Sequence, residues 1–219
     1  MSSTGRGAVR NAADWYPTPF WSVHRLLEHP VFEPAMEDAF GSWLEPCAGD
    51  GAIIRAVNSW FVARRELPVT WRAVELREEM RPVLEPLVGA ENVEIGSYLQ
   101  SKFGDPNRRY DVILTNPPFL GAELFLNRAL LQAKHVVMLL RLNFLGSEQR
   151  HGFFRRNMPE NIFVLPNRPA FNGDGKTDST EYAWFHWNTT TRVRHSKLHM
   201  LALTPPDERR PSGAEMGET

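Results

Sequence analysis

The chain has 219 residues, of which 42% are hydrophobic and 23% are charged, and its formal net charge is −1. This length suits one sizeable α/β domain and excludes two full ones, while the near-neutral charge excludes a surface that is basic throughout, as in many dedicated nucleic-acid-binding proteins. The single cysteine, Cys47, excludes an intramolecular disulfide.

The two ends of the chain differ in composition from its middle. We expect a flexible tail over residues 1–13, one folded domain over 14–204 and a disordered tail over 205–219, because both ends are rich in small and polar residues. The N-terminus lacks an apolar core of signal-peptide length, and no apolar run approaches membrane-spanning length. These features predict a cytoplasmic protein with no membrane segment.

Short apolar runs alternate with helix-length stretches from residue 42 onward. The expected strands are 42–45, 69–75, 92–95, 110–114, 135–140, 161–165 and 182–187, with a candidate last strand at 197–203. The expected helices are 52–65, 78–87 and 121–133. Continuous apolar strands that alternate with helices are typical of doubly wound sheets. We therefore predict a single-domain α/β fold with a mostly parallel, seven-stranded twisted sheet, a late antiparallel strand and helices on both faces.

A glycine-rich turn follows the first expected strand, in residues 44–53 (LEPCAGDGAI). Gly49 and Gly51 allow the backbone to turn sharply and approach a ligand, and a helix N-terminus with free N–H groups follows. The segment matches neither GxxxxGK[ST] nor GxGxxG. Glu45 and Asp50 would repel a pyrophosphate, but they suit a ligand with cationic sulfonium and ammonium groups. An ordinary capped turn is the alternative interpretation.

The second expected strand ends in an acid, Glu75. Nucleotide-binding folds hold a ribose diol with an acid at this place. A surface glutamate is the alternative, but the glycine-rich turn and Glu75 together favour a nucleoside-containing ligand.

Two adjacent prolines follow the strand at 110–114, in TNPPF (115–119). They remove two N–H donors and fix the backbone, which predicts a rigid platform at the carboxyl end of a central strand. The Asn116 side chain and the Pro117 backbone offer two carbonyl groups. These can accept the two N–H groups of an aromatic amino group and leave its lone pair directed at a methyl donor. Phe119 offers a flat face for the heterocycle. A strand-terminating turn is the alternative.

The late part of the chain holds candidate contacts to a phosphate backbone. Residues 141–156 contain four arginines, among them Arg141, but a solvated helix face explains them equally well. The polar, glycine-containing segment 167–180 includes Arg168 and Lys176, with a mobile hairpin loop as the alternative. We expect Trp184 to pack in the core rather than stack on a base. The histidines are too isolated from cysteines and acids to predict a metal site.

Several of these segments resemble known motifs. Residues 45–51 resemble the first motif of class I S-adenosylmethionine-dependent methyltransferases, and Glu75 resembles their second-strand acid. TNPPF resembles the [DNS]PP[YFW] motif of amino methyltransferases, and DWYPTPFW (14–21) resembles the Tyr-x-Thr-Pro element of many DNA adenine methyltransferases. The stretch 168–187 is similar to the late part of small phage or prophage DNA adenine-N6 methyltransferases. Many of these methyltransferases have an aspartate after the third strand, and this sequence has Ser97 at that place.

The resemblance implies a Rossmann-like methyltransferase fold and S-adenosylmethionine as the cofactor. It implies cofactor contacts from Tyr16, Thr18, Pro19, Glu45, Pro46, Cys47, Ala48, Gly49, Asp50, Gly51, Ile53, Glu75, Leu76, Ser97, Tyr98 and Asn116. It implies that the reaction is carried out at Asn116, Pro117, Pro118 and Phe119. For Thr18 and Pro19 the alternative is a helix cap, with Thr18 as the N-cap residue and Pro19 as the first helical residue.

The substrate that the resemblance favours is adenine in DNA, methylated at N6 after it leaves the base stack. Arg141, Arg168 and Lys176 are then the candidate DNA contacts, and a protein partner could supply sequence specificity. A bacterial or phage-infected cell is the expected setting. Two alternatives remain: an amino methyltransferase for RNA adenine or a protein glutamine amide, and a degenerate subunit that binds the cofactor without turnover.

Overall fold

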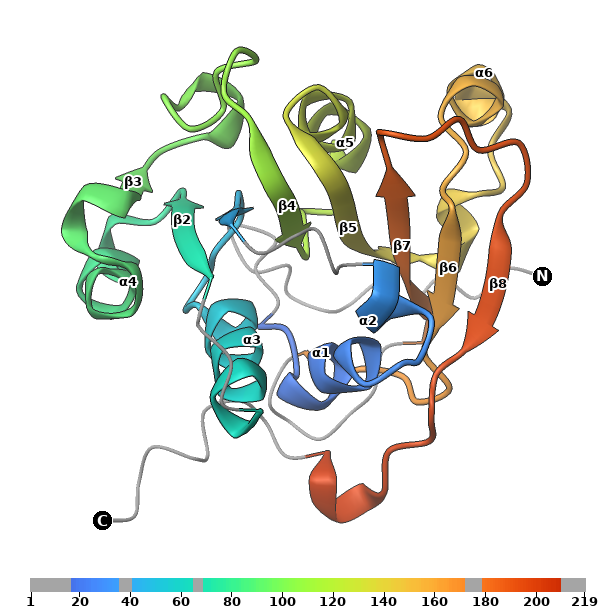
Figure 1. The fold of residues 1–219 in the computed structure, drawn as a ribbon, viewed down its shortest axis with the longest axis horizontal. Coiled ribbons are helices and arrows are strands. Elements are labelled where there is room, and N and C mark those ends of the chain that lie inside the picture. The colour runs from blue at the N-terminus through green and yellow to red at the C-terminus, as the bar shows by residue number, and fades with distance from the viewer. Residues whose placement is uncertain (1–16, 36–40, 65–68, 172–178, 210–219) are drawn as a thin grey trace.

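The computed structural model describes residues 17–35, 41–64, 69–171 and 179–209, and these build one eight-stranded sheet with helices around it (Figure 1). The strands are β1 Ser42–Glu45, β2 Thr70–Glu75, β3 Val93–Ile95, β4 Tyr110–Thr115, β5 Ala133–Arg141, β6 Asn161–Val164, β7 Tyr182–Asn188 and β8 Lys197–Met200. The helices are α1 Phe20–Leu27, α2 Phe32–Ala35, α3 Ala52–Ala63, α4 Arg81–Val88, α5 Ala122–Leu130 and α6 Glu148–Arg156.

The strand order is β3-β2-β1-β4-β5-β7-β6-β8. Strands β1 to β5 pair with one another in parallel, and β7 runs antiparallel between β5 and β6. The chain moves outward from β1 to β3 and then crosses back to β4 on the other side of β1. The carboxyl ends of β1 and β4 therefore flank a topological switch point, which is where open α/β sheets bind their ligands.

Both faces of the sheet are covered by apolar side chains. Neighbouring residues of one strand point to opposite faces, so Leu114 packs with α1 and α3 whereas Ile113 packs with α5 and α6. The same alternation places Trp184 and Phe185 in the two different cores. Trp184 has no exposed surface, and its Nε1 donates to the Ser22 backbone oxygen at 3.0 Å. The predicted packing role of Trp184 and the predicted α/β class are confirmed.

The sheet has one strand more than expected. The candidate segment 197–203 forms a strand over its first four residues only, and this strand, β8, pairs in parallel with β6. It lies at the sheet edge and its side chains are mostly exposed. Pairing with β6 rather than apolar patterning explains its place in the sheet.

Two helices differ from expectation in extent. The helix expected over 121–133 ends at Leu130, because Ala133 already belongs to β5 and pairs with Tyr110. The segment 78–87 splits into a 3₁₀ turn, Glu78–Met80, and helix α4. Neither of these helices, nor any other helix in the described ranges, is both long and apolar enough to cross a bilayer.

The C-terminal boundary also differs from the expected end of the domain at residue 204. A 3₁₀ turn spans Pro206–Glu208, and Glu208 forms an ion pair with Arg25 of α1 at 2.5 Å. Arg25 also donates to Thr204 at 3.2 Å. Residues 205–209 therefore belong to the described fold, while the segments 1–13 and 210–219 lie outside the described residues.

Candidate cofactor and catalytic site

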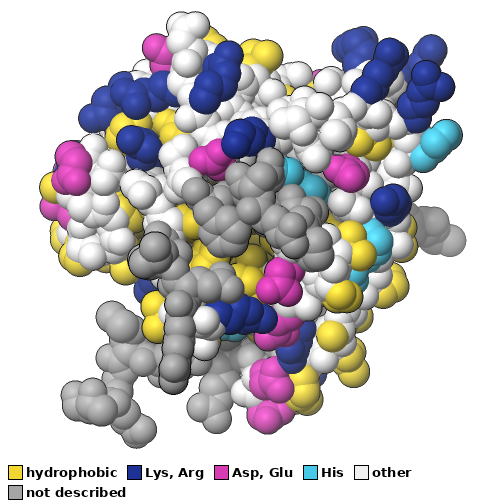
Figure 2. All heavy atoms as spheres, viewed as in Figure 1, with side chains coloured by type: hydrophobic (Ala, Val, Ile, Leu, Met, Phe, Trp, Pro, Cys, Tyr) yellow, Lys and Arg dark blue, Asp and Glu magenta, His cyan; other side chains and the backbone are white. Residues whose placement is uncertain are grey.

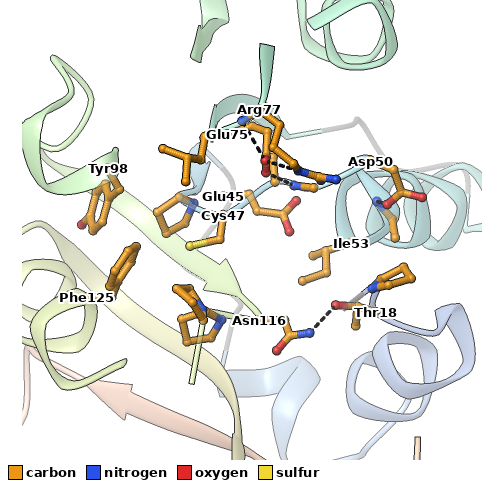
Figure 3. A pocket seen from close by; sticks show the side chains of 18 of the residues that line it. Thr18, Glu45, Cys47, Asp50, Ile53, Glu75, Arg77, Tyr98, Asn116 and Phe125 are labelled. Atoms are coloured by element: carbon orange, nitrogen blue, oxygen red, sulfur yellow. Dashed lines mark hydrogen bonds and ion pairs between the residues drawn. The ribbon is translucent and has the colours of Figure 1, made fainter. Parts of the chain in front are cut away.

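A cavity of about 800 Å³, counting its open mouth, lies at the carboxyl ends of β1, β2 and β4 (Figure 3). Most of the residues proposed from the sequence line it: Thr18, Glu45, Pro46, Cys47, Ala48, Gly49, Asp50, Ile53, Glu75, Leu76, Ser97, Tyr98, Asn116, Pro117 and Pro118. Segments that are far apart in the chain thus meet at the switch point of the sheet.

Five of the proposed residues that the structure describes do not line the cavity: Pro19, Gly51, Phe119, Arg141 and Arg168. The proposed residues Tyr16 and Lys176 are outside the described part of the chain. Gly51 has φ +78°, and a Cβ there would come within 2.6 Å of a Leu87 side-chain atom. This glycine therefore serves the turn before α3 and the close packing of α4.

The alternative interpretation of Thr18 as an N-cap is wrong. Helix α1 begins at Phe20, and its N-cap residue is Pro19, in an extended conformation. The Ser22 hydroxyl donates to the Pro19 backbone oxygen at 2.7 Å. Thr18 Oγ1 instead accepts a hydrogen bond from Asn116 Nδ2 at 3.2 Å, so this side chain belongs to the site.

Some cavity residues were missed in the sequence: Pro17, Ala52, Arg77, Gly96 and Phe125. Arg77 had a usable signal, because it stands two residues after Glu75 and side chains at i and i+2 of an extended segment share a side. The others carry no chemistry that would single them out.

Three carboxylates form an acidic wall of the cavity: Glu45, Asp50 and Glu75. Arg55 forms an ion pair with Asp50 at 3.2 Å, and Arg77 forms one with Glu75 at 2.8 Å. Glu45 forms no ion pair within the described ranges, and its Oε2 is buried without a hydrogen-bond partner there.

Burial raises the pKa of Glu45 well above its ordinary value. The carboxylates of Asp50 and Glu75 raise it further, against a smaller opposing effect of Arg55. Glu45 is therefore a group whose ionisation is costly unless a positive charge enters the cavity.

Glu75 connects the end of β2 to the glycine-rich turn. It is 6% exposed, which excludes the surface-glutamate interpretation. Its Oε2 accepts from the Gly49 backbone N–H at 2.7 Å, and its Oε1 accepts from Arg77 N at 3.1 Å and Arg77 Nε at 2.8 Å. A carboxylate offers about four lone-pair positions, so Oε2 retains capacity for one more donor.

The segment after β4 places the partly buried Asn116 on the cavity wall. Because Asn116 Nδ2 donates to Thr18, its carbonyl oxygen points away from Thr18 (Figure 3). Phe119 lies beyond the cavity, with the Arg141 guanidinium 4.5 Å from its ring centre and the Tyr182 ring centre at 5.6 Å. In the segment after β4, Pro118 is therefore the last residue that lines the cavity before the chain turns away from it at Phe119.

Cys47 supplies no nucleophile. Burial raises the pKa of its thiol well above the ordinary value, and the Glu45 and Glu75 carboxylates add to this effect. The thiol is therefore protonated at neutral pH, and it acts as a small side chain of the loop.

The arginines proposed as nucleic-acid contacts do not form one surface. Arg141 is partly buried over Phe119 and donates to Tyr182 Oη at 3.2 Å. Arg168 forms a surface ion pair with Glu181, which lowers the pKa of that carboxyl. Arg155 and Arg156 are exposed on α6, at the upper right of the view, where Figure 2 shows Lys and Arg side chains together. Within the described ranges, no cluster of three His, Cys, Asp or Glu residues could hold a metal.

No protein-family model matches the sequence, and no curated protein does. A solved structure from Listeria monocytogenes, assigned to the class I S-adenosylmethionine-dependent methyltransferases, matches with a TM-score of 0.59 and 13% identity over 86% of this chain. This chain spans 64% of that protein. A protein from Pyrococcus horikoshii assigned as an RNA methyltransferase matches with a TM-score of 0.57 and 16% identity, over 80% of this chain and 88% of that one.

The M protein of the type I restriction enzyme EcoKI matches with a TM-score of 0.56 and 14% identity, over 81% of this chain and 45% of that one. Identities this low establish the fold alone. The chain has the fold of class I S-adenosylmethionine-dependent methyltransferases, as its motifs predicted.

Proposed function

We propose that this protein transfers a methyl group from S-adenosylmethionine to the exocyclic N6 amino group of adenine in DNA. One observation carries the proposal: Asn116 and Pro117 lie on the wall of the same cavity as the buried carboxylates of Glu45 and Glu75. The acidic groups suited to a cationic methyl donor and the two carbonyl groups suited to the methyl acceptor thus line the same cavity. The fold neighbours add support, since they include a restriction-enzyme M protein and an RNA methyltransferase.

The cavity residues fit the cofactor. When bound, S-adenosylmethionine supplies an electrophilic methyl group on a positively charged sulfur. The Glu45 carboxylate, buried without an ion-pair partner in the described chain, fits a cationic ligand. Gly96 has φ +148°, and a Cβ placed there would meet no atom within 4 Å, so a glycine keeps that part of the wall open.

Each part of the wall has a proposed task. The turn from Pro46 to Asp50 would hold the methionine part, and Glu75 would accept from a ribose hydroxyl through its remaining lone pair. Ser97 and Tyr98, after β3, would lie against the adenine ring.

The reaction needs orientation more than acid–base chemistry. An aromatic amino nitrogen is a weak nucleophile because its lone pair is delocalised into the ring. The Asn116 side-chain oxygen and the Pro117 backbone oxygen would accept its two N–H groups, which directs the lone pair toward the cavity. Thr18 holds the Asn116 amide in the required orientation. The surplus proton leaves the amino group for water after transfer.

Phe119 and Arg141 complete the proposed acceptor side. The Arg141 guanidinium covers one face of the Phe119 ring, and an unstacked base would lie near this pair. Arg168 and Lys176 are retained as proposed phosphate contacts, and a protein partner as a source of specificity. The proposed compartment is the cytoplasm of a bacterial or phage-infected cell.

A methyl-transfer assay with labelled S-adenosylmethionine tests the proposal. Unmethylated genomic DNA, total RNA and a protein extract are offered to the wild type, to Asn116→Ala and to Asn127→Ala. Asn127 is a matched control because it is an exposed asparagine on α5, away from the cavity. We expect label in DNA as N6-methyladenine with the wild type and Asn127→Ala, and none with Asn116→Ala.

The other outcomes discriminate between the alternatives. Label in RNA or in protein glutamine would retain the chemistry and replace the substrate. Cofactor binding without label in any fraction would favour a subunit that has no turnover of its own.

A further inference from the structure

An apolar side chain projects from the catalytic platform. Leu120 is 89% exposed, which is the highest value among the large hydrophobic residues of the described chain. It stands four residues after Asn116, outside the cavity. The next residue, Gly121, has no atom within 4 Å of the position that a Cβ would take. The tip of this turn therefore extends into open space.

The chain is restricted on both sides of Leu120. Before it, Pro117 and Pro118 restrict the backbone. After it, α5 begins at Ala122 and is anchored by residues that are fully or almost fully buried: Ala122, Leu126 and Ala129. Leu120 is thus held out by a rigid turn between a strand end and a packed helix.

The residue before the tip contacts a cation. The Arg141 guanidinium lies 4.5 Å from the ring centre of Phe119, which directly precedes Leu120 in the chain. A single exposed leucine is ordinary on a protein surface. Its place on a restricted turn, three residues after the proposed acceptor Pro117 and next to Phe119 in the chain, is what distinguishes Leu120.

We propose that Leu120 is a wedge that enters the base stack of duplex DNA at the place vacated by the target adenine. This rests on the proposed function, and it names duplex DNA as the substrate form. A flipped base leaves a gap in the stack, and apolar side chains are suited to fill such gaps because they contact the neighbouring base faces. The wedge stabilises the open duplex and leaves the chemistry at Asn116 unchanged. Its contribution therefore disappears when the DNA is already single-stranded.

The test compares initial methylation rates on native unmethylated genomic DNA and on the same DNA after heat denaturation. For Leu120→Ala we expect a loss of about 10- to 100-fold on native DNA, from the apolar contact removed, and little change on denatured DNA. Leu124→Ala is the matched control, because Leu124 is 61% exposed one helical turn further along and should retain both rates. Melting temperatures of both variants should equal that of the wild type.

A Leu120→Ala variant that retains its rate on native DNA, or that loses both rates equally, overturns the wedge. So does a wild type that methylates denatured DNA only. A wild type that methylates neither form refutes the proposed function and the wedge with it. Selective loss on native DNA, with Asn116→Ala inactive on both forms, supports both proposals separately.

Discussion

Replacing Glu45 with glutamine should change stability and cofactor binding in opposite directions. In the folded protein the pKa of Glu45 is raised well above 4.5 by burial and by Asp50 and Glu75. Between 4.5 and the raised value, the folded chain holds more protons than the unfolded chain. The free energy of unfolding therefore falls as pH rises through this interval. Glutamine does not titrate, so the variant lacks this loss.

The size of the effect follows from the contacts of Glu45. A buried polar atom without a partner costs roughly 1–3 kcal/mol, and the glutamine amide retains part of that cost. We therefore expect the cofactor-free variant to be about 1 kcal/mol more stable than the wild type above neutral pH, or about 2–4 °C in melting temperature for a protein of this size. A lost charge-assisted hydrogen bond of roughly 1.5–3 kcal/mol should weaken S-adenosylmethionine binding about 10- to 150-fold.

Melting curves from pH 5 to pH 8.5, with and without S-adenosylmethionine, measure both effects. Glu79→Gln is the matched control, because Glu79 is exposed and lies outside the cavity. A Glu45→Gln variant that is less stable than the wild type at every pH, or that binds the cofactor as tightly, would refute the electrostatic reasoning.

Three further changes test other parts of the structure. Thr18→Val removes the acceptor that orients Asn116, so single-turnover methylation at saturating cofactor should slow about 3- to 10-fold with little change in melting temperature; an unchanged rate would contradict this role. Gly96→Val places a side chain in open cavity space at φ +148°, so calorimetry should detect no cofactor binding; binding at wild-type affinity would mean that the ligand lies elsewhere. Burial and His135 lower the pKa of His186 to about 3, so the folded state loses stability as pH falls below 6.5, by about 2 kcal/mol at pH 5. His186→Gln should lose less stability over that range in urea titrations, and an equal loss would assign the acid sensitivity to other groups.

The parts of the fold with local signals could be predicted from the sequence. Strand β4 ends within one residue of the expected position, because the apolar run ends at Leu114 and two prolines follow shortly after it. The turn before α3 could be predicted equally well, because its two glycines indicate a sharp turn, and Gly49 and Gly51 both adopt positive φ. The end of α5 was not, because residues 130–134 suit a helix and only pairing with Tyr110 makes Ala133 a strand residue.

The same division holds for the site. The motif segments identify the residues of the cavity wall, but not the contacts between those segments. Thr18 precedes a proline as N-cap residues often do, yet its partner Asn116 lies 98 positions away. Phe119 belongs to the motif by sequence, whereas Arg141 and Tyr182 hold it outside the cavity. Such contacts depend on the assembled sheet and leave no trace in local spacing.

The acidic wall of the cavity also bears on how the product would leave. Under the proposed function, the sulfur is positive before transfer and neutral afterwards, while Glu45 and its neighbours remain in place. The wall would then bind S-adenosylmethionine more tightly than the demethylated product. Each methyl transfer would thus lower the affinity of the protein for the product that remains in the cavity. Glu45→Gln should reduce the difference in affinity between S-adenosylmethionine and the demethylated product. An equal loss of affinity for both ligands would mean that Glu45 interacts with the ammonium group that they share. If the difference in affinity is reduced, the buried acid distinguishes the cofactor before and after methyl transfer. Product inhibition is then limited by the charge of the ligand rather than by its shape.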